Sequence, residues 1–106
     1  MTPEESIHKI VDKIVHHINP LQLILFGSQA RGDAHRDSDY DLLIIAPSNQ
    51  PRWKRTVKIY RLLAGSGLPK DIVWWTPSEI AEWKDVKGHF INNILREGIV
   101  MYERPT

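Results

Sequence analysis

The chain has 106 residues, and its 14 Lys and Arg against 13 Asp and Glu leave a net charge of +1, which gives no overall field favouring nucleic acid or membrane binding. A hydrophobic fraction of 42% and a charged fraction of 25% are typical of a globular protein and argue against disorder. Without cysteine, a long apolar run or an apolar leader, the sequence excludes a disulfide scaffold and predicts one domain over 1–106, located in the cytoplasm.

The first half of the chain predicts one helix and two strands. Residues 2–18 carry isoleucine and valine at helical spacing, and Thr2 with Glu5 three residues later forms a capping-box pattern. Residues 21–26 are nearly all apolar and too short for a helix, which indicates a buried strand. After a polar stretch, residues 39–46 predict a second strand.

The second half continues the alternation. We expect a helix over 51–64, a strand over 70–75, a helix that begins at Thr76 and ends near Gly88, a helix over 89–97 and a strand over 99–102. In helix 51–64, Trp53 lies on the apolar side and is expected in the core. Phe90 and Leu95 are expected to point inward, and Trp83 is the tryptophan expected at an interface.

The order of these elements predicts a mixed sheet. Strand 39–46, helix 51–64 and strand 70–75 have the lengths of a β-α-β unit, which makes the two strands parallel. If the start of strand 39–46 lies near the end of strand 21–26, those two strands are antiparallel. The fold class is therefore α/β (α+β), with a mixed sheet of three to four strands flanked by helices.

Three aspartates are the candidate catalytic residues. Asp39 and Asp41 alternate with Tyr40 along a strand, so the two carboxylates share one face. Asp71 begins the next strand, and parallel pairing would bring all three carboxylates to one sheet edge. Such a group suits Mg²⁺, which takes one or two carboxylates together with substrate phosphates. Solvated aspartates, or an ion pair between Asp71 and Lys70, are the alternatives.

The segment after the first strand has the residues of a phosphate-binding loop. Gly27 lets the backbone approach a phosphate closely, and Ser28 can offer its hydroxyl and backbone N–H. Arg31 could contact the same phosphate. A plain turn and a surface arginine are the alternatives.

These residues together resemble a known family. Gly27-Ser28-Gln29-Ala30-Arg31-Gly32 followed by Ser38-Asp39-Tyr40-Asp41-Leu42 is similar to the signature of the DNA polymerase β-like nucleotidyltransferases, and in particular of the minimal nucleotidyltransferases. The resemblance extends along most of the chain and includes Asp71. Position 29 is often Arg in these proteins and is Gln here.

The resemblance implies a function. Asp39, Asp41 and Asp71 would bind one or two Mg²⁺ ions, and Gly27 and Ser28, with Arg31 nearby, would hold the triphosphate of ATP. The enzyme would transfer AMP to a hydroxyl, namely that of a tyrosine of a helical HEPN-type toxin, and would thereby act as its antitoxin.

Two other functions remain open. The chain could neutralise its partner by forming a complex, without catalysis, or it could modify a small molecule such as an aminoglycoside. Because the predicted elements use nearly the whole chain, we expect a second protein to supply most of the acceptor site, in a hetero-oligomer. Direct binding of nucleic acid is the less attractive reading, given the charge balance.

Overall fold

The computed structural model describes residues 2–35 and 38–105, which form four strands and six helices within those ranges. The elements follow in the order α1 (Pro3–Ile18), β1 (Gln22–Phe26), α2 (Ser28–Arg31), β2 (Tyr40–Ile45), α3 (Arg52–Arg55), α4 (Val57–Leu62), β3 (Lys70–Trp75), α5 (Pro77–Trp83), α6 (Phe90–Glu97) and β4 (Ile99–Glu103).

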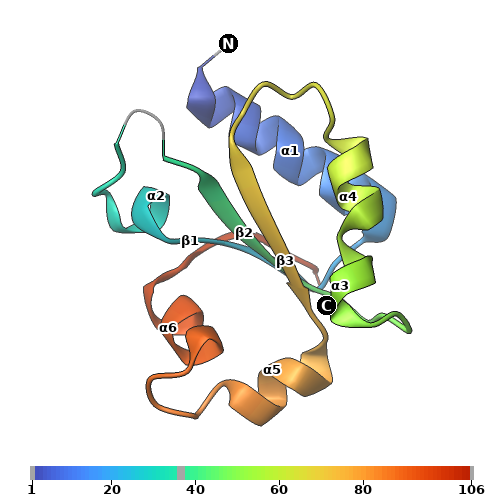
Figure 1. Ribbon diagram of the computed structural model, residues 1–106, viewed down its shortest axis with the longest axis vertical. Helices are drawn as coiled ribbons and strands as arrows, with labels where there is room; N and C mark the ends of the chain where they lie inside the picture. The colour runs from blue at the N-terminus through green and yellow to red at the C-terminus, as the bar shows by residue number, and fades with distance from the viewer. Residues whose placement is uncertain (1, 36–37, 106) are drawn as a thin grey trace.

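The strands form one mixed sheet in the order β3-β2-β1-β4 (Figure 1). β1 is antiparallel to both β2 and β4, whereas β2 and β3 are parallel and are joined through α3 and α4. The predicted β-α-β unit, the antiparallel first pair and the α/β fold class are therefore confirmed.

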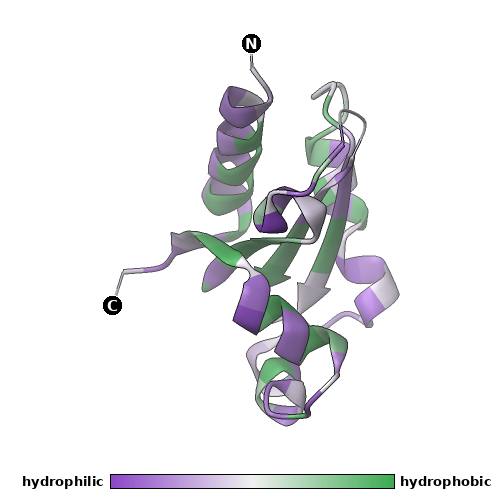
Figure 2. Ribbon diagram, turned by 90° about the vertical axis from the view of Figure 1, so that its left-hand side faces the viewer, coloured by the Kyte–Doolittle hydropathy of each residue, from purple (hydrophilic) through white to green (hydrophobic). Residues whose placement is uncertain are grey.

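Helices cover both faces of the sheet (Figure 1). Leu23 and Leu25 of β1 belong to a cluster shared with α1 and α4, whereas Ile24 belongs to a second cluster shared with α5 and α6. Successive residues of a strand point to opposite faces, so each strand contributes to both clusters. In Figure 2 the strands between the helices are mostly hydrophobic, and the apolar side of α1 faces them.

Helix α1 begins and ends where the sequence predicts. The Thr2 hydroxyl oxygen accepts from the backbone N–H of Glu5 at 3.1 Å, which satisfies one free N–H of the first turn. The helix ends at Asn19, which adopts a left-handed conformation with φ 45°. Its four buried residues, Ile7, Ile10, Val11 and Ile14, follow the predicted apolar stripe.

Helix 51–64 is the main correction to the predicted elements. It is two helices, α3 and α4, which meet at Thr56. The predicted core position of Trp53 is wrong, because this side chain is 74% exposed. Arg55 is buried instead, and its guanidinium donates to the carbonyl of Trp74 at 3.1 Å and to Glu79 at 2.6 Å. The acidic partner Glu79, which lies far along the chain, makes burial of this arginine favourable, and the residue pattern of helix 51–64 does not indicate that partner.

Three apolar residues of α5 and α6 also differ from expectation. In α6, Ile91 and Ile94 are buried as predicted, but Phe90 and Leu95 are exposed. Trp83 is half-buried and stacks on the His89 ring at 4.5 Å between centroids, so it is not the exposed tryptophan. Of the four apolar residues of α6, only Ile91 and Ile94 therefore reach the core.

Over residues 2–35 and 38–105, we find no helix that combines the length and the apolar character required to cross a membrane.

Candidate active site

Two of the three predicted carboxylates lie side by side. Asp41 of β2 pairs in register with Asp71 of β3 in the parallel ladder, so both side chains point to the same face of the sheet. Asp41 is also opposite Phe26 of β1, which places all three side chains on the face that α6 covers. Asp39 is exposed and immediately precedes β2. The predicted pairing of Asp41 with Asp71 is confirmed. Because Asp39 lies outside β2, its place in one site with the other two carboxylates stays a prediction.

Gly27 provides the space that the Asp41 carboxylate occupies. Its φ of +73° is in the region that favours glycine, and a Cβ there would overlap Asp41 Oδ2 and lie 3.2 Å from Asp41 Cγ. The backbone that follows β1 therefore lies directly against this carboxylate. A group bound at the Gly27 backbone would be next to Asp41.

The electrostatic environment of Asp41 reflects its neighbours. Burial raises the pKa of the Asp41 carboxyl, and the negative charges of Asp71 and Asp39 raise this pKa further, while Arg31 lowers it. The site thus holds more negative charge than its own cations neutralise. This is the setting in which a bound divalent cation is favourable.

The donor atoms of the site fit an oxygen-loving cation. In the described parts of the chain, no three His, Asp or Glu side chains are gathered closely enough to hold a metal ion alone. Mg²⁺ does not require such a cage, since it commonly uses one or two carboxylates and takes its other oxygens from water and substrate phosphates. Asp41 and Asp71, with Asp39 at the mouth of the site, supply oxygens of this kind.

The short helix α2 carries the other predicted residues. Ser28 is its first residue, directly after Gly27. Gln29, which stands where the resembling proteins often have Arg, donates from its side chain to the Ser38 carbonyl at 3.2 Å. This bond connects α2 to the residue before Asp39. Arg31 is exposed and forms an ion pair with Asp33 at 3.3 Å.

Tyr60 of α4 is a site residue that the sequence analysis missed. Its hydroxyl donates to Asp71 Oδ1 at 3.3 Å and accepts from the backbone N–H of Ile72 at 2.7 Å. Burial raises the pKa of the Tyr60 phenol, as does the nearby Asp71 charge. The sequence signal for this role was a tyrosine on an otherwise apolar side of a helix. A phenol packed there needs a hydrogen-bond partner for its hydroxyl, and a neighbouring strand can supply one.

A pocket of about 340 Å³ adjoins the Gly27 loop. Its wall consists of Phe26 and Gly27 at the end of β1, Arg31 of α2, and Phe90, Asn93, Ile94, Arg96 and Glu97 of α6. Because Gly27 also lies against Asp41, this pocket and the Asp41 carboxylate adjoin the same loop. A molecule bound at the loop could extend into the pocket.

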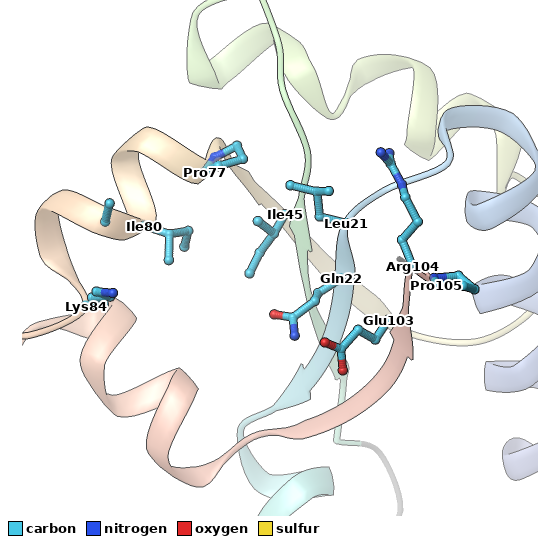
Figure 3. Close-up of a pocket in the computed structure, with 10 residues that line it drawn as sticks. Leu21, Gln22, Ile45, Pro77, Ile80, Lys84, Glu103, Arg104 and Pro105 are labelled. Carbon is cyan, nitrogen blue, oxygen red and sulfur yellow. The ribbon is translucent and has the colours of Figure 1, made fainter.

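A pocket of about 520 Å³ lies at the other end of the sheet (Figure 3). It is lined by Leu21 and Gln22 at the start of β1, by Ile45 at the end of β2, and by Pro77 and Ile80 of α5, among others. The carboxylates are at the opposite ends of β1 and β2. This pocket is therefore separate from the candidate active site.

Comparisons with known proteins agree on a family. The model of the family described as polymerase beta, nucleotidyltransferase matches residues 8–106. A protein of Methanocaldococcus jannaschii, provisionally named a protein adenylyltransferase, is 36% identical over 78 residues, which cover 74% of this chain and 75% of that protein.

Solved structures show the same fold. A provisionally assigned nucleotidyltransferase from Sulfolobus solfataricus superposes with a TM-score of 0.67 at 20% identity, covering 94% of this chain and 79% of its own. A toxin–antitoxin structure with AMP-PNP superposes with a TM-score of 0.55 at 19% identity, covering 91% and 73%. At these identities the likeness extends to the arrangement of the backbone.

Proposed function

The chain belongs to the polymerase beta nucleotidyltransferase family, and we propose that it transfers AMP from ATP to a hydroxyl group of a partner protein. The observation that carries this proposal is the register of Asp41 with Asp71, with Gly27 directly against Asp41. This arrangement puts a carboxylate pair beside a loop that can approach a triphosphate closely. The same geometry supports binding of ATP with Mg²⁺.

The proposed roles follow from position. Asp41 and Asp71, joined by Asp39, would hold Mg²⁺, which would neutralise phosphate charge and favour ionisation of the attacking hydroxyl. Gly27 and Ser28 would bind the triphosphate through their backbone N–H groups, because the first N–H groups of a helix have no partner within it.

The transfer itself is a displacement at the α-phosphorus. The acceptor oxygen forms a bond to the α-phosphorus of ATP, and the bond from that phosphorus to the oxygen bridging to the β-phosphate breaks, releasing pyrophosphate. Asp71 would accept the proton of the hydroxyl, and its register with Asp41 supports this role. Tyr60, which donates to Asp71 Oδ1, would hold that carboxylate in place.

We infer that the acceptor is a tyrosine of a HEPN-type toxin, in a pair where this chain is the antitoxin. The name of the M. jannaschii relative supports transfer to protein, and the fold shared with a toxin–antitoxin structure supports such a pairing. The protein would work in a hetero-oligomer, with the acceptor site supplied by the partner.

The test uses ATP labelled at the α-phosphate, the purified chain, Mg²⁺ and the candidate partner. We expect label on the partner with the native chain and its loss with Asp39→Asn or Asp41→Asn. Asp12→Asn, on the exposed side of α1, is the matched control and should retain labelling. Undiminished labelling by both site variants would refute the assigned roles.

A second candidate function is neutralisation by binding alone. Leu95, Ile99 and Val100 are exposed on α6 and on β4, which is an edge strand, and they could form a protein interface. A toxicity-rescue assay with the Asp39→Asn, Asp41→Asn double variant separates the two functions. Full rescue by the folded double variant favours binding, and failed rescue favours catalysis.

A further inference from the structure

We propose that the pocket between α2 and α6 holds the purine base of the nucleotide, with Phe90 stacking on the base and Asn93 donating a hydrogen bond to it. This inference rests on the proposed function, because it assigns the base of the same nucleotide. It adds specificity-determining residues on α6, a helix to which the sequence analysis gave no part in the site.

The position of the pocket is the first argument. Gly27 lines it, and the same residue lies against Asp41. A nucleoside whose triphosphate is bound along this loop, next to the carboxylates, can therefore extend into this cavity. The pocket volume of about 340 Å³ falls within the range of about 300–1,000 Å³ that is usual for small-molecule sites.

The aromatic pair in the pocket is the second argument. The Phe90 and Phe26 rings meet edge to face, with centroids 5.6 Å apart and planes at 87°. Phe26 belongs to β1 and packs against the core, so it holds Phe90 in a defined orientation. Phe90 nevertheless stays 44% exposed. An oriented aromatic ring that remains accessible in a pocket is suited to stacking on a base.

The polar groups on α6 are the third argument. Asn93 Oδ1 accepts from Arg96 Nη2 at 3.1 Å. The amide nitrogen of Asn93 therefore points away from Arg96 and can donate to another group. Ring nitrogens of a purine, such as N7, are acceptors. Arg31 lines the pocket on the α2 side and adds a cation near the loop proposed to bind the phosphates. The lining thus offers a stacking surface, a hydrogen-bond donor and a cation, which are the groups that a purine nucleotide can use.

The experiment compares two ligands that differ in the nucleoside. Calorimetric titrations of ATP and of inorganic tripolyphosphate, each with Mg²⁺, are made on the native chain and on Phe90→Ala. We expect Phe90→Ala to weaken ATP binding by roughly tenfold or more and to leave tripolyphosphate binding unchanged. Phe90→Tyr, which keeps the ring, should retain ATP affinity and shows that the position tolerates substitution.

Leu95→Ala is the matched control, since Leu95 is an exposed apolar residue of the same helix outside the pocket. It should change neither affinity. A second readout is base preference: Asn93→Ala should reduce the ratio of ATP to CTP affinity, because it removes the donor proposed to bind the purine N7.

The outcomes separate this inference from the proposed function. If the native chain binds ATP more tightly than tripolyphosphate but Phe90→Ala matches Leu95→Ala, the base pocket is refuted and the proposed function stands. Equal native affinity for the two ligands also refutes the base pocket. If the native chain binds neither ligand, the proposed function fails, and the base pocket fails with it.

Discussion

Replacing Glu79 with Gln should destabilise the fold, because this residue connects helices α3 and α5. Glu79 Oε1 accepts from Arg55 Nη1 at 2.6 Å and from the backbone N–H of Thr76 at 2.8 Å. Its Oε2 accepts from Arg55 Nη2 at 3.2 Å and from Arg52 Nη2 at 3.3 Å. Helix α3 is thereby fastened to the start of α5. The substitution keeps the shape of the side chain and removes its charge.

The expected loss is about 1–3 kcal/mol. Hydrogen bonds from Arg55, aided by the backbone of Thr76, lower the pKa of the Glu79 carboxyl from 4.5 to about 2, against the opposing effect of burial. A shift of this size corresponds to at most about 3 kcal/mol, since each pKa unit is worth about 1.36 kcal/mol. Because the Glu79 side chain is 23% exposed, solvent screening reduces this value.

The pH dependence gives the sharper test. Because the folded pKa is lowered, the stabilisation is fully present above pH 4.5 and is lost as the pH falls toward about 2. Urea unfolding followed by tryptophan fluorescence, from pH 7 down to about pH 2.5, measures the free energy of unfolding of both proteins. The difference between native and variant should shrink steadily below pH 4.5.

The matched control is Glu97→Gln, which breaks only an exposed ion pair with Arg96 at 3.5 Å. We expect a change within about 0.5 kcal/mol at every pH. If the difference between the native protein and Glu79→Gln did not depend on pH, the pair with Arg55 would not be the source of its stability.

Three further changes have defined outcomes. Gly27→Ala should cost at least about 2 kcal/mol in urea unfolding, because its Cβ meets both a carboxylate and a positive φ, whereas Gly32→Ala should cost only the backbone strain of about 1 kcal/mol. Tyr60→Phe should lower the rate of nucleotide transfer and raise the Mg²⁺ concentration required, with about 1 kcal/mol of destabilisation, by releasing Asp71; a normal Mg²⁺ dependence would contradict this. Trp53→Ser should shift the free energy of unfolding by less than about 0.5 kcal/mol, and a loss of several kcal/mol would place its ring in the core.

Much of the site was predictable because it depends on local patterns. The alternation of side chains along β2 fixes which of them share a face with Asp41, and the length of the following crossover makes the next strand parallel. Register then brings Asp71 to Asp41. Each step uses residues within one strand or one supersecondary unit. The pairing of Asp41 with Asp71 therefore follows from periodicity and handedness alone.

The remaining features depend on contacts between distant segments. Arg55 is buried because it pairs with Glu79, which lies 24 residues further along the chain. No pattern within helix 51–64 indicates that partner. The same periodicity assigned Trp53 to the core, since it is apolar, and the short α3 instead turns it outward. Phe90 differed for a related reason: its place beside Phe26 is set by how α6 docks on the sheet.

The pairing of the first strand with the last has a consequence for how the molecule folds. Gln22 is paired with Glu103, so β1 and β4 join residues roughly 80 positions apart, and closing so long a loop is slow. The hairpin-like contacts of β1 with β2 and the β2–β3 crossover are closer in sequence and can form earlier. During synthesis, the carboxylate edge can therefore assemble before β4 docks. Because α6 leads directly into β4, the α6 side of the pocket, which includes Phe90, is expected to be the last part of the site to form.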